Sequence, residues 1–392
     1  TRVPKNASNA SMRSTGPAGA RRVSSLPARP RPPRNLGDTI MLPWRAMPSS
    51  PLLRALWPAL AFAYLACFLA TAHFVPEGPR ERDGYYHAQV SRTLLSRGVS
   101  RSFPWTQQSS WKEGYCDKEF LYHVAMAPFT YLTGEPIRGA QIFTTLLSLC
   151  AFGLLFFILR RHGAPAPTLF VLLMATMGGG FWVRLTMVRS HVLSISLALI
   201  GLHLLMERRH RALLILGFVY AWSYTFPFVL LMFAAPFVVG RALAGDGLDW
   251  KSPLFATVGV GLGLAIHPYT PLTLETFLTL LKIIRVGAGS GGGELFGLGR
   301  EIYAYPTRMF LMLYPLLTLS VFGLLLWGFL RRRAPRPETL GLLCVAIFWV
   351  LMSFVFSRFV EYAAPVMALT LGLVLRDTFP ELSFATLRAL WR

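Results

Sequence analysis

Long apolar runs alternate with short polar loops along the chain, which is the pattern of a polytopic membrane protein. The apolar runs repeatedly reach the ~20 residues that a helix needs to cross a bilayer, and they contain few charges. We therefore expect an all-α transmembrane helical bundle with about ten spans. The predicted spans cover residues 52–75, 139–160, 165–184, 191–206, 211–225, 228–241, 253–268, 308–330, 337–356 and 359–376.

Basic residues determine the predicted orientation. With a cytoplasmic N-terminus, all the basic clusters between spans face the cytoplasm, as the positive-inside rule requires; they lie at 160–162, 207–211, 331–333 and 376. The apolar piece 120–132 must then be re-entrant or interfacial, because ~13 residues are too few to span. Two long outer loops result, 76–138 and 269–307, and long loops are usually functional. We expect the chemistry on the outer face, centred on the first loop.

Composition supports a membrane protein and narrows its partners. The chain is 54% hydrophobic and 15% charged, with a mean hydropathy of +0.47. A net charge of +21 would indicate nucleic acid for a soluble protein, but here the excess lies in the N-terminal tail and beside apolar runs. We expect membrane lipids and no nucleic acid as partners. Five Lys against 34 Arg is typical of a GC-rich bacterial genome, which indicates a bacterial inner membrane.

Both ends of the chain are predicted to lie outside the transmembrane domain, which covers 51–377. Residues 1–50 are rich in Arg, Pro, Ser and Ala without apolar periodicity, so we expect a disordered basic tail. Because the chain begins with Thr and Met41 and Met47 directly precede the first span, part of this tail is expected to be non-native. Residues 378–392 are a predicted cytoplasmic tail, and the glycine-rich stretch 287–293 a flexible hinge.

The first outer loop contains an ionisable cluster at 83–87, Asp-Gly-Tyr-Tyr-His. It opens an amphipathic helix predicted over 83–98, and a carboxylate at a helix N-terminus is favoured by the helix dipole. Asp83 can there accept a proton or coordinate a cation. The alternative is that Asp83 only caps the helix. Ionisable groups at a membrane domain are expensive, which favours a functional site.

A second cluster, Asp117-Lys118-Glu119, opens the 120–132 piece and is followed by His123. His123 lies four residues after Glu119 and therefore on the same helical face. The alternative is an acid-rich helix N-terminus with one hydrogen-bonded histidine. The chain has no Cys/His spacing typical of a zinc site and no glycine-rich phosphate loop.

The 83–87 stretch, directly after the first span, resembles the Asp-x-Tyr-Tyr-His stretch of archaeal and bacterial oligosaccharyltransferase catalytic subunits. More broadly, the chain resembles polytopic glycosyltransferases with the C-type (GT-C) fold, which take sugars from polyprenyl-phosphate carriers. The similarity is local over 80–135 and architectural over 52–376. It implies that Asp83 is the acidic catalytic residue of the first loop, as a base or as a ligand of a divalent cation such as Mg²⁺ or Mn²⁺.

The chain also differs from the oligosaccharyltransferase pattern. These enzymes have a second Asp-x-Asp-like motif in the next outer loop, whereas the matching stretch 184–191 has no carboxylate, and no Trp-Trp-Asp-type motif follows. The resemblance therefore implies transfer of one sugar from a polyprenyl-phosphate donor to a lipid, glycan or protein hydroxyl. Asp117 and Glu119 are the candidates to replace the missing acid.

A polyprenyl phosphate develops negative charge as it leaves, so cations must face it. Arg358 is one candidate; the alternative is that it only anchors the last span with Glu361, three residues later. Arg300 and Arg308 are predicted to lie at the same depth in the membrane as Arg358. The candidate substrate-binding residues are Tyr86, His87, Lys118, His123, Arg184, Arg189, His191, Arg358 and Glu361.

Two other function classes stay open, a transporter or lipid flippase and a non-catalytic scaffold subunit. Transporters place ionisable groups near mid-span and show repeated halves. Here the candidate groups are predicted to collect at one face, which favours the enzyme.

Overall fold

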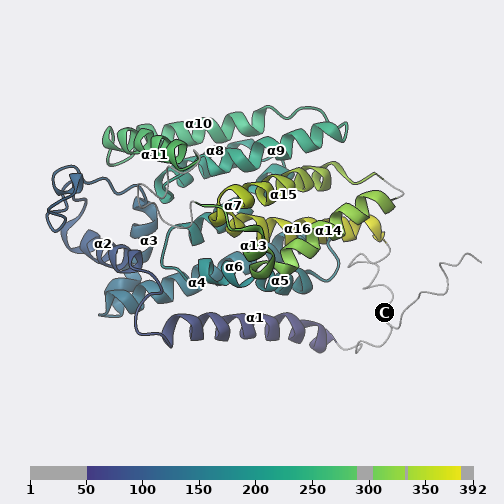
Figure 1. Ribbon diagram of the computed structural model, residues 1–392, viewed down its shortest axis with the longest axis horizontal. Helices are drawn as coiled ribbons and strands as arrows, with labels where there is room; N and C mark the ends of the chain where they lie inside the picture. The colour runs from purple at the N-terminus through teal and green to yellow at the C-terminus, as the bar shows by residue number, and fades with distance from the viewer. Residues whose placement is uncertain (1–50, 289–302, 332–333, 381–392) are drawn as a thin grey trace, which may run out of the picture. The chain divides into compact units, whose positions relative to one another are not determined.

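Helices make up the computed structural model, which describes residues 51–288, 303–331 and 334–380. No strand occurs in these residues, so the all-α prediction is confirmed. Residues 1–50, residues 289–293 of the glycine-rich stretch and residues 381–392 lie outside the described residues. The helices, shown in Figure 1, are α1 (Pro51–Phe74), α2 (Asp83–Arg97), η3 (Ser110–Lys112), α3 (Phe120–Leu132), α4 (Pro136–Arg161), α5 (Pro167–Thr176), α6 (Gly179–Leu185), α7 (His191–Met206), α8 (His210–Ser223), α9 (Val229–Leu243), α10 (Lys251–Ala265), α11 (Leu272–Ala288), α13 (Thr307–Leu313), α14 (Pro315–Leu330), α15 (Pro337–Val355), η5 (Ser357–Phe359) and α16 (Val360–Thr378).

Fewer helices are long enough to span a membrane than the sequence pattern predicted. Four qualify within the described residues: Leu56–Phe74, Pro136–Arg161, Pro337–Val355 and Ser357–Thr378. The predicted spans 165–184 and 308–330 are each a helix pair bent by 94°, so the count reaches at most six. The predicted spans near 191–206, 228–241 and 253–268 are helices of 15 or 16 residues, below the ~20 needed. The count of ten is therefore not supported.

The helices α1 and α14 have large apolar side chains that are exposed. On α1 they include Trp57, Tyr64 and Phe68, and on α14 Phe322 and Phe329. Broad exposed apolar surfaces of this kind are costly in water and typical of contact with lipid. Together with the candidate spans, they make this a multi-pass membrane protein.

The core of the described bundle lies where α9, α15 and α16 meet. Phe233, Trp349 and Tyr362 are almost fully buried there, with ring centroids 4.7–5.6 Å apart. Aromatic pairs at this spacing contribute beyond their buried area. This packing places the start of α16, where Arg358 and Glu361 lie, against the rest of the bundle.

Both short helices of the first loop agree with the prediction. The amphipathic segment predicted over 83–98 is α2, whose buried positions Gly84, His87, Ala88 and Ser91 follow helical periodicity. The helix ends at Gly98, whose φ of 71° is readily adopted by glycine. The apolar piece 120–132 is α3, with 13 residues.

α2 and α3 lie side by side and are fixed to each other and to α4 (Figure 1). Arg92 of α2 donates to the carbonyl oxygens of Thr130 (3.2 Å) and Gly134 (2.8 Å) at the end of α3, where helix carbonyls lack partners. Gly139 of α4 lets the backbones approach, because a Cβ there would collide with the backbone of Phe129. The candidate residues of the two loop clusters therefore lie on a braced framework.

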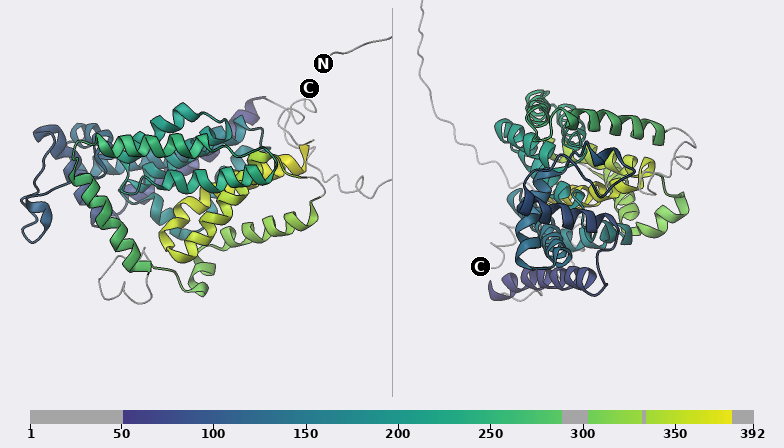
Figure 2. Two further views of the ribbon diagram at one scale, coloured as in Figure 1. Left: turned by 90° about the horizontal axis from the view of Figure 1, so that it is seen from above. Right: turned by 90° about the vertical axis from the view of Figure 1, so that its left-hand side faces the viewer.

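The second predicted outer loop, 269–307, is partly helical. α11 occupies residues 272–288 and turns away from the axis of α10, as Figure 2 shows. This helix was not predicted, although its apolar positions recur at helical spacing with few loop-forming residues.

Three of the predicted cytoplasmic clusters meet at one end of the bundle. Arg161 at the end of α4 donates to Glu207 after α7 (3.1 Å), and Arg376 of α16 donates to the carbonyl oxygen of His162 (2.9 Å). The orientation predicted from charge requires these clusters to share one side of the membrane. Their contacts agree with that requirement.

Candidate functional site

Three consecutive residues at the start of α7, residues 189–191, connect the candidate groups. Arg189 pairs with the Asp83 carboxylate (Nη2 to Oδ2, 2.5 Å), and Ser190 donates to Glu119 (2.7 Å). The third residue, His191, lies 2.7 Å through Nε2 from the carbonyl oxygen of Arg184. The stretch 184–191, which contains no carboxylate, thus contacts both acidic clusters of the first loop.

Asp83 is the first residue of α2, as predicted, and no side-chain capping hydrogen bond is found at the start of this helix. Its side chain is 57% exposed and its ion-pair partner is Arg189. The carboxylate is both accessible and held beside a guanidinium.

A second carboxyl, Glu81, lies next to this pair. Both of its carboxylate oxygens are buried. Burial raises the pKa of Glu81 to about 7, and the positive charge of Arg189 only partly opposes this. A carboxyl that titrates near neutral pH is suited to proton transfer, and sequence reasoning did not single it out.

Behind α2, the second acidic cluster joins two histidines. His87 Nδ1 lies 2.8 Å from His123 Nε2, and His123 Nδ1 lies 2.9 and 2.8 Å from the two Asp117 carboxylate oxygens. Burial lowers the pKa of His87 to about 3. For His123 burial acts in the same direction, but the Asp117 carboxylate outweighs it and raises the pKa. The alternative of a single hydrogen-bonded histidine does not describe this chain of three groups.

Glu119 is oriented by hydroxyl groups from two other elements. Its Oε1 accepts hydrogen bonds from Ser190 (2.7 Å) and from Thr225 (2.5 Å), which follows α8. Its Oε2 lies 3.6 Å from His87 Nδ1. Glu119 is therefore fixed with one oxygen toward the histidines.

Arginines from three parts of the chain converge near the start of α7. The charges of Arg184, Arg358 and Arg189 all act on the buried His191 ring. Arg358 Nη2 donates to the Tyr224 hydroxyl (3.1 Å). Two of these arginines are paired with carboxylates, Arg189 with Asp83 and Arg184 with Glu361.

Arg184 rather than Arg358 holds Glu361. Arg184 Nε and Nη2 lie 2.8 and 2.6 Å from Glu361 Oε2, and both side chains are buried. The pair between Arg358 and Glu361 considered from their spacing is not formed, because Glu361 in the first turn of α16 faces α6. Arg358 is therefore not anchored through Glu361.

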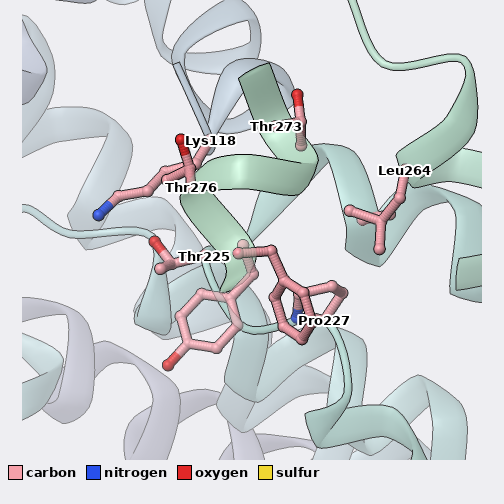
Figure 3. A pocket seen from close by; sticks show the side chains of 9 residues that line it. Lys118, Thr225, Pro227, Leu264, Thr273 and Thr276 are labelled. Carbon is pink, nitrogen blue, oxygen red and sulfur yellow. The ribbon is translucent and has the colours of Figure 1, made fainter. Parts of the chain in front are cut away.

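A small cavity lies beside these groups. Its volume of about 10 Å³ has room for about one water molecule. Figure 3 shows Lys118, Thr225 and Thr276 grouped on one side and Leu264 on the opposite side. Tyr224, whose hydroxyl accepts from Arg358, also lines it.

Another candidate, Tyr86, contacts aromatic residues of the first loop. Its hydroxyl lies 2.7 Å from that of Tyr115, and its ring packs against Phe103 and Trp111. A cavity of about 110 Å³ adjoins this aromatic group and lies along the C-terminal half of α2. It is smaller than the roughly 300 Å³ of typical ligand pockets, so it does not define the site.

Asp83 does not fit the divalent cation that the resemblance implied. Among the described residues two groups bring three metal-ligand atoms together, His87 with Glu119 and His123, and His162 with His203 and Glu207. Neither includes Asp83, whose close partner is the guanidinium of Arg189. A cation ligand set around Asp83 is therefore not supported by these residues.

Sequence reasoning missed the residues that join the clusters, namely Ser190, Thr225, Tyr224 and Glu81. Hydroxyl residues at the ends of apolar runs are common, and only their contacts distinguish these. Glu81 had a signal, since an acid two residues before Asp83 lies on the same loop.

Comparisons with known proteins connect this geometry to a fold. No family model and no curated protein matches the chain. Solved structures of the oligosaccharyltransferase from Archaeoglobus fulgidus do match. One, with a tethered acceptor peptide containing the NVT sequon, is 18% identical, has a TM-score of 0.55 and covers 83% of this chain and 50% of its own.

Two further structures of the same archaeal enzyme, AglB, agree. One, in complex with an inhibitory peptide and a dolichol-phosphate, is 17% identical with a TM-score of 0.58, covering 86% of this chain and 52% of its own. The apo form is 16% identical with a TM-score of 0.58, covering 85% and 52%. The chain spans about half the length of these proteins. At this identity the likeness shows the fold alone, which is the one these oligosaccharyltransferase structures have, as the resemblance implied.

Proposed function

We propose that this protein is a membrane glycosyltransferase that moves a sugar from a polyprenyl-phosphate donor to a hydroxyl of a lipid, glycan or protein at the outer face of the membrane. The observation that carries the proposal is the accessible Asp83 carboxylate, held by Arg189 beside two further arginines. This set of groups pairs a proton acceptor with a binding site for a leaving phosphate. The fold shared with an oligosaccharyltransferase supports it.

In the proposed reaction, the acceptor oxygen attacks the anomeric carbon of the sugar. The new carbon–oxygen bond forms as the bond from this carbon to the phosphate oxygen breaks, and its electron pair leaves with the polyprenyl phosphate. Asp83 accepts the hydroxyl proton. Arg358, Arg189 and Arg184 stabilise the negative charge on the leaving phosphate, with Glu361 positioning Arg184.

Arg189 occupies the place beside Asp83 where the resemblance implied a metal ion. A guanidinium carries a permanent positive charge and two parallel donors that match a phosphate. We propose that Arg189 orients Asp83 and the donor phosphate together. The dolichol-phosphate bound to the similar archaeal enzyme supports a donor of the polyprenyl-phosphate class.

The transporter alternative is less favoured. The candidate groups lie on α2, on α3 and at the starts of α7 and α16, whereas a transport path needs ionisable groups along its length. The same binding groups at one end of the bundle suit an enzyme working at the membrane surface.

Purified protein mixed with radiolabelled polyprenyl-phosphate sugars and membrane lipids should consume the donor and release polyprenyl phosphate. Because phosphate recognition does not depend on the sugar, titration with polyprenyl phosphate itself tests the site before the sugar is known. Absence of binding in that titration would contradict the proposed function.

Arg358→Lys should weaken polyprenyl-phosphate binding about tenfold, since lysine keeps the charge but loses one of two parallel hydrogen bonds. Arg358→Ala should weaken it further. The matched control is Arg138→Lys, an exposed arginine near the start of α4 that pairs with Glu135, which should bind as wild type. Equal affinity of wild type and Arg358→Lys would leave Arg358 as a span anchor, because an anchor needs only a long cationic side chain.

Thiol labelling tests the proposed orientation. The native Cys116 is buried, so single cysteines introduced at exposed Glu113 and Arg209 in a cysteine-free background are the reporters. An impermeant reagent should label position 113 from outside and position 209 only after permeabilisation, because basic loops stay cytoplasmic. Labelling of 209 from outside would reverse the orientation.

A further inference from the structure

Three side chains with ligand atoms meet behind α2. His87 Nδ1, His123 Nε2 and a Glu119 carboxylate oxygen all lie within 4.8 Å of one another. Their residues are 5%, 0% and 9% exposed. They come from α2, from α3 and from the residue preceding α3. No sequence motif of fixed spacing therefore identifies them.

Neighbouring groups orient two of the three ligands. Asp117 binds His123 Nδ1 through both oxygens, which leaves Nε2 to face His87. A carboxylate behind a histidine ligand is the usual arrangement at protein metal sites. Ser190 and Thr225 bind the first oxygen of Glu119 and leave its second oxygen, 3.6 Å from His87 Nδ1, on the ligand side.

The spacing of the two imidazoles is close to that of metal ligands. Their facing nitrogens lie 2.8 Å apart, whereas two nitrogens bound to one ion at ~2.1 Å lie about 3.0–3.4 Å apart. A shift of about half an ångström in one ring would admit an ion. Without an ion, one proton must lie between these nitrogens, and an ion replaces that proton.

We propose that His87, His123 and Glu119 bind one divalent transition-metal ion of the zinc class, with Asp117 positioning His123. Two imidazoles and a carboxylate suit zinc and its neighbours, whereas magnesium and calcium prefer oxygen ligands. The ion joins α2 to α3, and through Ser190 it also fixes the segment that carries Arg189. Three protein ligands leave one coordination position open. This site stands independently of the proposed sugar transfer.

A similar group at the other end of the bundle provides an internal control. His162 Nε2 and His203 Nδ1 lie 3.1 Å apart. The carboxylate beside His203 Nε2, that of Glu207, however, lies 3.9 Å away, whereas Asp117 lies within hydrogen-bond distance of His123. Its acid, Glu207, pairs with Arg161 at 3.1 Å and with Arg209 at 3.5 Å. Two guanidinium groups compete there with any cation, so we expect weaker metal binding at this group.

Zinc affinity of the purified full-length protein, measured by competition with a chromophoric chelator, tests the proposal. Wild type should bind about one zinc ion tightly, and Co²⁺ in its place should give the visible absorption bands of a tetrahedral site. Glu119→Gln keeps an acceptor for Ser190 and Thr225 but removes a ligand charge, and should abolish tight binding. Asp117→Asn should weaken binding about 10–100-fold, and His203→Gln should leave it unchanged.

Several outcomes would overturn the site. If the wild-type protein binds neither Zn²⁺ nor Co²⁺, the proposed site is refuted without any variant. Tight binding that persists in Glu119→Gln, or that disappears in His203→Gln, would place the ion elsewhere. If Glu119→Gln fails to fold, chelation of wild type decides: removal of zinc should lower the thermal midpoint and added Zn²⁺ should restore it, and an unchanged midpoint would refute the proposal. None of these measurements depends on whether the protein transfers a sugar.

Discussion

Asp83→Asn is expected to abolish sugar transfer while the protein still folds and inserts. The amide cannot accept the acceptor proton and loses the charge that pairs with Arg189. Loss of a general base typically lowers the rate by about 100-fold or more. The fold should tolerate the change, because Asp83 is 57% exposed and exposed ion pairs contribute at most about 1 kcal/mol to stability. The measurement is donor consumption alongside the thermal midpoint in detergent.

Two further variants make this result specific. Glu77→Gln removes an exposed acid of the same loop and should leave transfer unchanged. Glu81→Gln removes the buried carboxyl whose pKa burial raises to about 7. If transfer is lost with Glu81→Gln and survives in Asp83→Asn at more than about a third of its rate, the proton acceptor is Glu81 and Asp83 is structural.

Glu361→Leu is expected to destabilise the protein by about 3–5 kcal/mol, the cost of leaving one member of a buried ion pair without its partner. Glu361 is fully buried, and its partner Arg184 is 6% exposed. The leucine keeps most of the volume, so the lost carboxylate rather than a cavity causes the effect. The free energy of unfolding, followed by denaturant titration in detergent, measures it.

The double variant Arg184→Leu, Glu361→Leu distinguishes charge from packing. Apolar replacement of both members of a buried pair is often neutral, so it should recover most of the lost stability. The exposed pair of Glu135 and Arg138 is the surface control, and Glu135→Gln should change stability by less than about 1 kcal/mol. Wild-type stability in Glu361→Leu would mean that water reaches Arg184.

The Arg184 pair also explains why the alternative considered from spacing, a pair between Arg358 and Glu361, is not the one the packing forms. Arg358 is three residues from Glu361, and one helical turn normally allows such a pair. Arg358, however, lies in η5 just before α16, whereas Glu361 faces α6 and its arginine. Spacing along one helix identifies only the neighbours within that helix. A buried carboxylate pairs with the cation that the packing of separate helices places beside it.

The same contrast applies to the spans. Apolar runs located nearly every helix, because burial in lipid or core selects the same residues. They overcounted the spans, because runs such as 191–206 form helices of ordinary core length. A bend of 94° within 167–185 or 307–330 also leaves no trace in hydropathy, since both halves are apolar.

Local chemistry determined much of this protein from the sequence alone. Periodicity placed α2 and α3, charge grouped the basic loops, and the 83–87 stretch pointed to Asp83 and to the fold that the archaeal structures share. Only the tertiary structure decided the partners: Arg189 for Asp83, Arg184 for Glu361, and His87 for His123. The physical reason is the separation along the chain over which each kind of interaction acts. Helix formation and membrane partition depend on neighbouring residues, whereas these pairs join side chains 36 to 177 positions apart, and the packing of separate helices brings them together.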